Sequence, residues 1–90
     1  MKDKFKQWLA SKGYSLETPS GKPSTVYDYA KRIDRVCHWE NMTWSALAAD
    51  IERIIKEYNT GGVKAEKGNK SHRAVINALL QFKYFLSAQQ

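Results

Sequence analysis

The sequence predicts a compact all-α bundle of four or five helices. Four stretches repeat their apolar residues at the 3.6-residue period of an α-helix, and glycine, proline or short polar segments separate them. Ninety residues, 42% of them hydrophobic, suffice for one domain with a single core. We therefore expect residues 1–90 to form one helical domain, with loops near 14–23 and 59–70.

The first helix is predicted over Lys2–Lys12. Its apolar residues fall at positions i, i+3 and i+4 and share one side: Phe5, Trp8 and Leu9. Lysines occupy the remaining sides, and Gly13 stands where a left-handed cap would end the helix. We expect the aromatic residues to face the core rather than a ligand. The next segment, Tyr14–Pro23, contains two prolines and a glycine, which favour a loop.

The second helix begins at Ser24 or Thr25, because either hydroxyl can cap it. Its apolar stripe consists of Val26, Tyr29, Ala30, Ile33, Val36 and Cys37. Off this stripe stand three basic residues, Lys31, Arg32 and Arg35. Asp28 is spaced to pair with Arg32. An ordinary salt-bridged surface explains this charged face about as well as DNA binding does.

One helix is predicted over Trp44–Tyr58, capped by Thr43. The pair Gly61-Gly62 follows its end. In the next segment, lysines recur at every third position: Lys64, Lys67 and Lys70. This spacing would place them on one side of a helical turn, but Gly68 and Asn69 favour a loop equally.

The last helix, capped by Ser71, is the most apolar element, so we expect it to lie at the centre or to be covered by something beyond residue 90. Its first turns are instead polar and basic, with Lys70, His72, Arg73 and Asn77. A helix that enters a DNA groove by its N-terminus has this division, polar where it enters and apolar where it is anchored.

Charge is distributed unevenly along the chain, whose formal net charge is +6. Residues 1–22 carry five lysines against two acidic residues, and residues 61–90 carry five basic residues against one acidic residue. The middle of the chain is balanced or slightly acidic. Such an excess suits either a solvated surface or a face that binds a polyanion, most commonly nucleic acid.

Several function classes find no support in the sequence. The N-terminus is polar, and no apolar run approaches the ~18–20 residues that span a bilayer. The single cysteine, Cys37, excludes an internal disulfide and a multi-cysteine zinc site and favours a cytoplasmic setting. No motif for hydrolysis, phosphate binding or calcium binding is present. We expect no enzyme, metal, cofactor, membrane or small-molecule substrate.

Core and capping positions follow one another in a definite order: Phe5, Trp8-Leu9, Ser24-Thr25, Tyr29, Ile33, Trp44, Leu47, Ile51, Ser71, Ala78-Leu79, Phe82 and Phe85-Leu86. This order resembles the N-terminal core-binding (SAM-like) domain of tyrosine recombinases, the phage integrase family. The resemblance implies a helical module that clamps one side of a DNA duplex for DNA integration or recombination. The catalytic tyrosine of that family lies in a separate C-terminal domain, so no tyrosine here is assigned as a nucleophile.

In the resembled family the second and last helices of the module supply most DNA contacts. Together with the spaced lysines, this carries the DNA-binding role to Thr25, Lys31, Arg32, Arg35, Lys64, Lys67, Lys70, His72, Arg73 and Asn77. The expected partner is double-stranded DNA, with a C-terminal catalytic domain or a second copy as further partners. The alternative is a protein–protein module that docks through Phe82–Leu86, and an unspecialised helical domain is a third reading.

Overall fold

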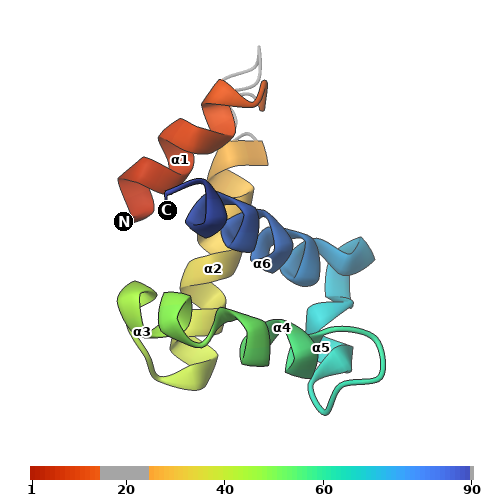
Figure 1. The fold of residues 1–90 in the computed structure, drawn as a ribbon. Coiled ribbons are helices and arrows are strands. Elements are labelled where there is room, and N and C mark those ends of the chain that lie inside the picture. Colours follow the sequence, from red (N-terminus) through yellow and green to blue (C-terminus); the bar gives the residue numbers. More distant parts are fainter. Residues whose placement is uncertain (15–24, 90) are drawn as a thin grey trace.

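The computed structural model describes residues 1–14 and 25–89, without the side chains of residues 70–72. These residues form an all-α bundle with no strand, as predicted (Figure 1). The described residues contain six helices rather than the four or five predicted: α1 (Lys2–Ser11), α2 (Thr25–Glu40), α3 (Trp44–Ala49), α4 (Ile51–Tyr58), α5 (Ala65–Gly68) and α6 (Lys70–Ala88).

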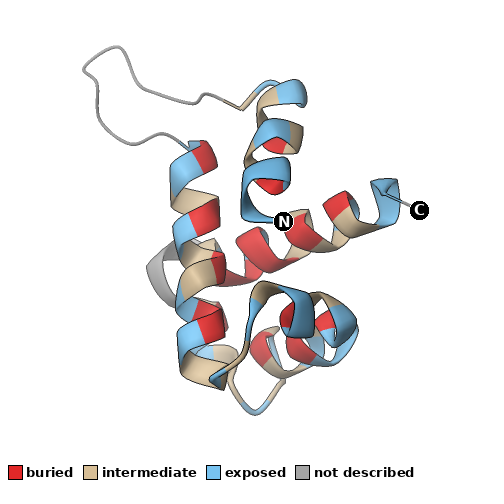
Figure 2. Ribbon diagram, turned by 90° about the vertical axis from the view of Figure 1, so that its left-hand side faces the viewer, coloured by how far each residue is buried: buried red, intermediate tan, exposed pale blue. Residues whose placement is uncertain are grey.

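Helix α6 lies at the centre of the bundle, where its apolar composition predicted it. The cap predicted at Ser71 is wrong, because the helix already begins at Lys70 and Asn69 occupies the N-cap position. It contacts each of the other five helices, and its packing against α2 is the most extensive in the fold. Its inward positions are almost completely buried: Val75, Ile76, Ala78, Leu79, Phe82 and Phe85. Figure 2 shows the same division on α2, which turns buried positions towards the bundle and exposed positions outward.

Aromatic rings join α1, α3 and α6 in the core. The ring centroids of Phe5 and Phe82 are 5.3 Å apart, and Trp44 approaches Phe82 at the same distance. Both pairs meet edge to face, the arrangement that aromatic quadrupoles favour. Phe5 and Leu9 are completely buried, so the aromatic side of the first helix faces the core as expected.

The helix predicted over Trp44–Tyr58 is two helices, because the chain breaks at Asp50. The Thr43 hydroxyl accepts a hydrogen bond from Ala46 N at 3.1 Å, which confirms the predicted cap. The break allows Leu47 on α3 and Ile54 on α4 both to be fully buried. Burial of these two side chains stabilises the domain more than the intrinsic helical propensity of one uninterrupted helix would.

The segment after α4 folds back closely on that helix. Gly61 adopts a φ of +87°, and a Cβ on Gly68 would collide with the carbonyl oxygen of Tyr58. Lys64 N donates to Glu57 O at 2.7 Å, which holds the turn against α4. The segment predicted as a loop near 59–70 therefore contains the single turn of α5.

Candidate nucleic-acid interface

The outward face of α2 carries two basic side chains that make no ion pair with any described residue, Lys31 and Arg35. They are exposed and stand four residues apart, so they lie one above the other on the same side of the helix. Thr25, exposed at the beginning of α2, is another of the four contacts predicted on this helix. Ser24, the other candidate cap, lies outside the described residues.

Arg32 lies at the margin of this face, with 22% of its side chain exposed. Its Nη2 is 3.6 Å from Asp28 Oδ1, which confirms the predicted pair. Its Nε is buried and has no hydrogen-bond acceptor in the described part of the chain. A buried N–H without an acceptor costs about 1–3 kcal/mol, so an added acceptor would stabilise this side chain.

Lys67, in the segment where lysines recur at every third position, lies beside α2. Its ammonium nitrogen lies 5.0 Å from the ring centroid of Trp39, in a cation–π contact between α5 and α2. The Trp39 ring in turn stacks on Tyr58 at 6.2 Å. Lys67 remains exposed, so its charge stays accessible while its position is held.

Lys64 points into a different environment, although the sequence grouped it with Lys67. Its ammonium nitrogen is 2.6 Å from Glu40 Oε2 and 2.9 Å from Glu57 Oε1. Hydrogen bonds to these two carboxylates raise its pKa. The charge of Lys64 is thereby balanced by carboxylates of the domain itself, which reduces the part expected of it in a phosphate contact.

Glu40 is the least exposed carboxylate of this cluster, with 11% of its side chain accessible. Burial raises its pKa, but hydrogen bonds from Lys64 and from the Tyr58 hydroxyl, at 2.7 Å, hold that pKa below its ordinary value. Burial and the bond to Glu40 also raise the pKa of Tyr58. The cluster therefore joins α2, α4 and the turn before α5.

Arg73 and Asn77 are exposed and stand four residues apart on α6. Arg73 Nη2 donates to Asn59 Oδ1 at 2.9 Å, a neutral acceptor, and the guanidinium group has no acidic partner among the described side chains. The backbone of Arg73 adopts a φ of +65°, which costs a non-glycine residue about 1–2 kcal/mol. Lys70 and His72 were predicted beside it, but their side chains lie outside the described ones.

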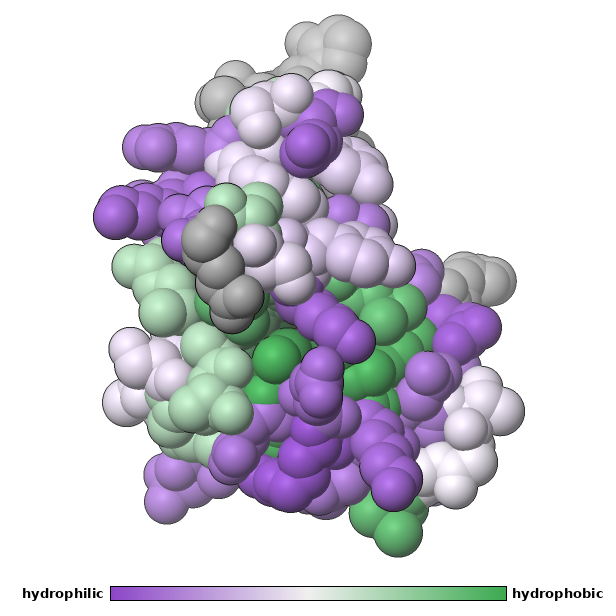
Figure 3. Space-filling model, viewed as in Figure 1, coloured by the Kyte–Doolittle hydropathy of each residue, from purple (hydrophilic) through white to green (hydrophobic). Residues whose placement is uncertain are grey.

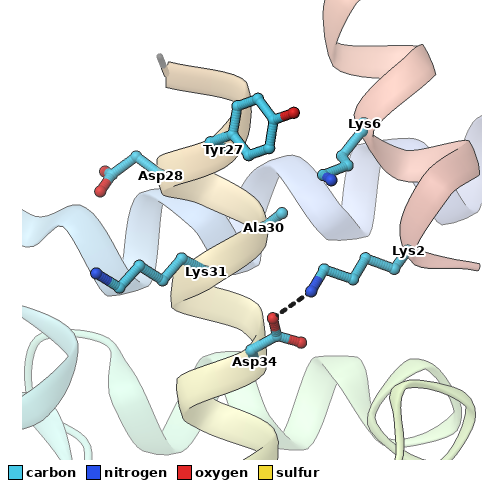
Figure 4. A pocket seen from close by; sticks show the side chains of 7 residues that line it. All are labelled: Lys2, Lys6, Tyr27, Asp28, Ala30, Lys31 and Asp34. Carbon is cyan, nitrogen blue, oxygen red and sulfur yellow. Dashed lines mark hydrogen bonds and ion pairs between the residues drawn. The ribbon is translucent and has the colours of Figure 1, made fainter. Parts of the chain in front are cut away.

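Two lysines of α1 lie beside α2, a proximity that the sequence analysis missed (Figure 4). Lys2 Nζ is 2.6 Å from Asp34 Oδ2, and Lys6 Nζ lies 4.5 Å from the ring centroid of Tyr27. The Trp44 indole also donates to Asp34, at 2.8 Å. Although burial raises the pKa of Asp34, these hydrogen bonds hold it below its ordinary value. The five lysines in residues 1–22 were the available signal.

Comparisons with protein-family models, curated proteins and solved structures found no match to this chain. In the part of the chain that the structure describes, no cluster of three or more histidine, cysteine or acidic side chains is arranged to hold a metal ion. No helix among those residues has the length and apolar character needed to cross a membrane.

Proposed function

We propose that this domain binds double-stranded DNA through the outward face of α2 and the neighbouring basic residues of α5 and α6, without catalysing a reaction. The observation that carries the proposal is the accessible charge of Lys31 and Arg35, one turn apart and unmatched by acidic residues in the described structure. Contacts to DNA phosphates require exposed basic side chains, and these two lie along the same side of one helix.

The dimensions of α2 suit a duplex. A helix of sixteen residues extends about 24 Å, which corresponds to about seven base pairs at 3.4 Å each. Lys67 lies at one side of this helix, so its ammonium group widens the basic surface. Arg32 and Arg73 add two guanidinium groups, which bind phosphate well because their donors form a fixed fork.

The resemblance to the core-binding module of tyrosine recombinases supports the same surface, because the second and last helices supply DNA contacts in that family. In a chain that also contains a catalytic domain, this module would hold the duplex while the other domain performs integration or recombination.

Salt dependence of DNA binding tests the proposal. Five basic side chains, if each meets a phosphate, predict a slope of about −4 to −5 for log affinity against log salt concentration. The contributing residues are Lys31, Arg32, Arg35, Lys67 and Arg73. Fluorescence anisotropy with a labelled 20-base-pair duplex in rising NaCl measures this slope. A slope near zero would contradict the proposal.

A charge-matched control separates a defined contact surface from overall charge. The double variant Lys31→Gln/Arg35→Gln should lower the magnitude of the slope by about two and weaken binding at every sequence tested. The variant Lys56→Gln/Lys83→Gln loses the same charge elsewhere, from α4 and the C-terminal half of α6, and should leave the slope nearly unchanged. Equal losses in both variants would contradict a surface centred on α2.

The C-terminal part of α6 is the surface for the second candidate function, docking to a protein partner. Figure 3 shows apolar side chains reaching the surface over α6, bordered by hydrophilic ones. Tyr84 is 55% exposed there, whereas Phe82 and Phe85 are 0% and 2% exposed because they serve the domain's own core. If the partner is a second copy of the chain, light scattering after size exclusion should show an assembly that Tyr84→Ala weakens, whereas a monomer would exclude the second copy as the partner.

A further inference from the structure

The hollow between α1 and α2 combines an apolar interior with a cationic margin (Figure 4). The Tyr27 ring, 44% exposed, forms one wall, and Ala30, 1% exposed, lies at the bottom. The methylene stems of lysines complete the walls, as long basic side chains commonly do. The residues around the hollow are Lys2, Lys6, Tyr27, Asp28, Ala30, Lys31 and Asp34.

Both carboxylates at the hollow already have cationic partners. Asp34 accepts from Lys2 at 2.6 Å and from the Trp44 indole at 2.8 Å. Asp28 pairs with Arg32 at 3.6 Å and, in Figure 4, points away from α1. The ammonium group of Lys6 instead has the Tyr27 ring as its neighbour. The potential at the mouth of the hollow therefore favours an anion.

Lys31 connects this hollow with the proposed duplex surface. Its stem lines the hollow, while its ammonium group points to the outer side of α2 in Figure 4. Lys31 follows Tyr27 by four residues, so DNA that contacts Lys31 through a phosphate lies about one helical turn from the Tyr27 ring. Lys6 lies across the hollow from Tyr27, on α1.

An apolar wall with an exposed aromatic ring and an ammonium group beside it fits a nucleobase and its phosphate. Bases stack on aromatic side chains regardless of sequence, and basic residues follow the backbone. A phosphate alone would not use the Tyr27 ring or Ala30. Paired bases are stacked inside the duplex, so only an unpaired nucleotide can bring its flat face into the hollow.

We propose that the hollow between α1 and α2 binds one unpaired nucleotide at the end of, or at a break in, the DNA held on α2. The base lies against the Tyr27 ring, and the Lys6 ammonium group moves from the ring to the nucleotide's phosphate. The exchange is favourable because an exposed cation–π contact is weaker than a base–aromatic stack. This inference rests on the proposed function and adds a preference for DNA with a single-stranded part.

Anisotropy titrations with two related probes test it: a blunt 20-base-pair duplex, and the same duplex with a three-nucleotide thymidine overhang. The wild-type protein should bind the overhang probe about five- to tenfold more tightly, as expected for one stacked base. Tyr27→Ala should abolish this difference while leaving blunt-duplex affinity unchanged. Tyr27→Phe should preserve the difference, because phenylalanine also stacks.

Two further variants sharpen the result. Lys6→Gln should reduce the overhang preference and also lower the magnitude of the salt slope for the overhang probe by about one. Tyr84→Ala removes a similarly exposed tyrosine from the C-terminal part of α6 and should change neither probe's affinity. Circular dichroism confirms that each variant is folded.

The outcomes separate the two proposals. Equal affinity of the wild type for both probes, or an unchanged preference in Tyr27→Ala, would overturn the nucleotide site and leave duplex binding intact. Failure to bind the blunt duplex would overturn the proposed function. In that case, Tyr27-dependent binding of single-stranded oligothymidine would support the hollow as a nucleotide site, and no such binding would overturn it as well.

Discussion

Lys31 on α2 and Lys64 before α5 carry the same charge in opposite settings. Lys64 is 2.6 and 2.9 Å from two carboxylates, one of them nearly buried. Lys31 is exposed, has no acidic partner among the described residues, and stands one turn from Arg35. Like charges at this spacing destabilise a helix by about 0.2–0.5 kcal/mol. The ion pairs of Lys64 hold helices together, whereas Lys31 and Arg35 keep two like charges at the surface that are unfavourable for the stability of α2.

This difference separates stability from binding. Neutralised charges join elements and contribute to folding, while unmatched charges contribute little to folding and remain accessible to a polyanion. Substitutions in the Lys64 cluster should therefore change unfolding, and substitutions on the outward face of α2 should change the salt dependence of DNA binding.

Gly68→Ala should have the largest effect, because it disrupts the contact between α4 and α5. The added Cβ collides with the Tyr58 carbonyl oxygen, so we expect the free energy of unfolding to fall by about 2 kcal/mol or more. Gly13→Ala is the control: Gly13 has φ +98° but open space around it, so it costs only about 1–2 kcal/mol of backbone strain. Urea unfolding measures both, and equal losses would contradict the close approach.

Lys64→Met should lower the free energy of unfolding by about 1 kcal/mol, because Glu40 loses a hydrogen-bonded partner in a poorly solvated position. The slope of DNA affinity against salt should stay the same. Lys31→Met should show the reverse, with the magnitude of the slope lower by about 0.9 and stability within about 0.5 kcal/mol of the wild type. If both variants lose stability equally, or both lower the salt slope equally, then Lys64 and Lys31 do not have separate roles in folding and in DNA binding.

Stability should fall in acid, because the folded domain holds the pKa values of Glu40 and Asp34 below their ordinary values of 4.5 and 3.8. The unfolded chain therefore takes up these protons at higher pH, and protonation favours unfolding. The stabilisation is complete above about pH 5 and is lost as the pH falls through the lowered values. Glu40→Gln should flatten a plot of melting temperature against pH between 5 and 2, whereas an unchanged profile would remove Glu40 from the cause.

The double variant Lys31→Gln/Arg35→Gln should change stability least. Surface substitutions usually lie within about 0.5 kcal/mol, and removal of the like-charge pair favours the helix slightly. We expect a free energy of unfolding equal to that of the wild type or a few tenths of a kcal/mol higher, measured by urea unfolding. A clear loss would indicate that these side chains support the fold.

Much of the local structure could be predicted from the sequence. The cap formed by Thr43, the left-handed Gly13 and the pairing of Asp28 with Arg32 all depend on neighbours within four residues. The apolar composition of the last helix likewise predicted its central place. The predicted continuity of Trp44–Tyr58 was wrong, because burial of two short helices prevailed over the propensity of one longer helix.

The candidate interface could be predicted only in part. Helical spacing alone indicates that Lys31 and Arg35 share a face away from the apolar stripe. No spacing rule distinguishes Lys64 from Lys67, since each stands in the same run of lysines. Their difference comes from Glu40 and Trp39, which lie more than twenty residues away in the sequence.

By itself, the sequence determined the helical class, the Thr43 cap of α3, the core side of each helix and the exposed charge of α2, because periodicity and capping act within one or two turns. The tertiary structure decided which lysines are neutralised, where the chain breaks at Asp50, and that Lys6 of α1 meets Tyr27 of α2. Ion pairs, ring contacts and hollows depend on distances across space, and only the packing of helices against α6 sets those distances.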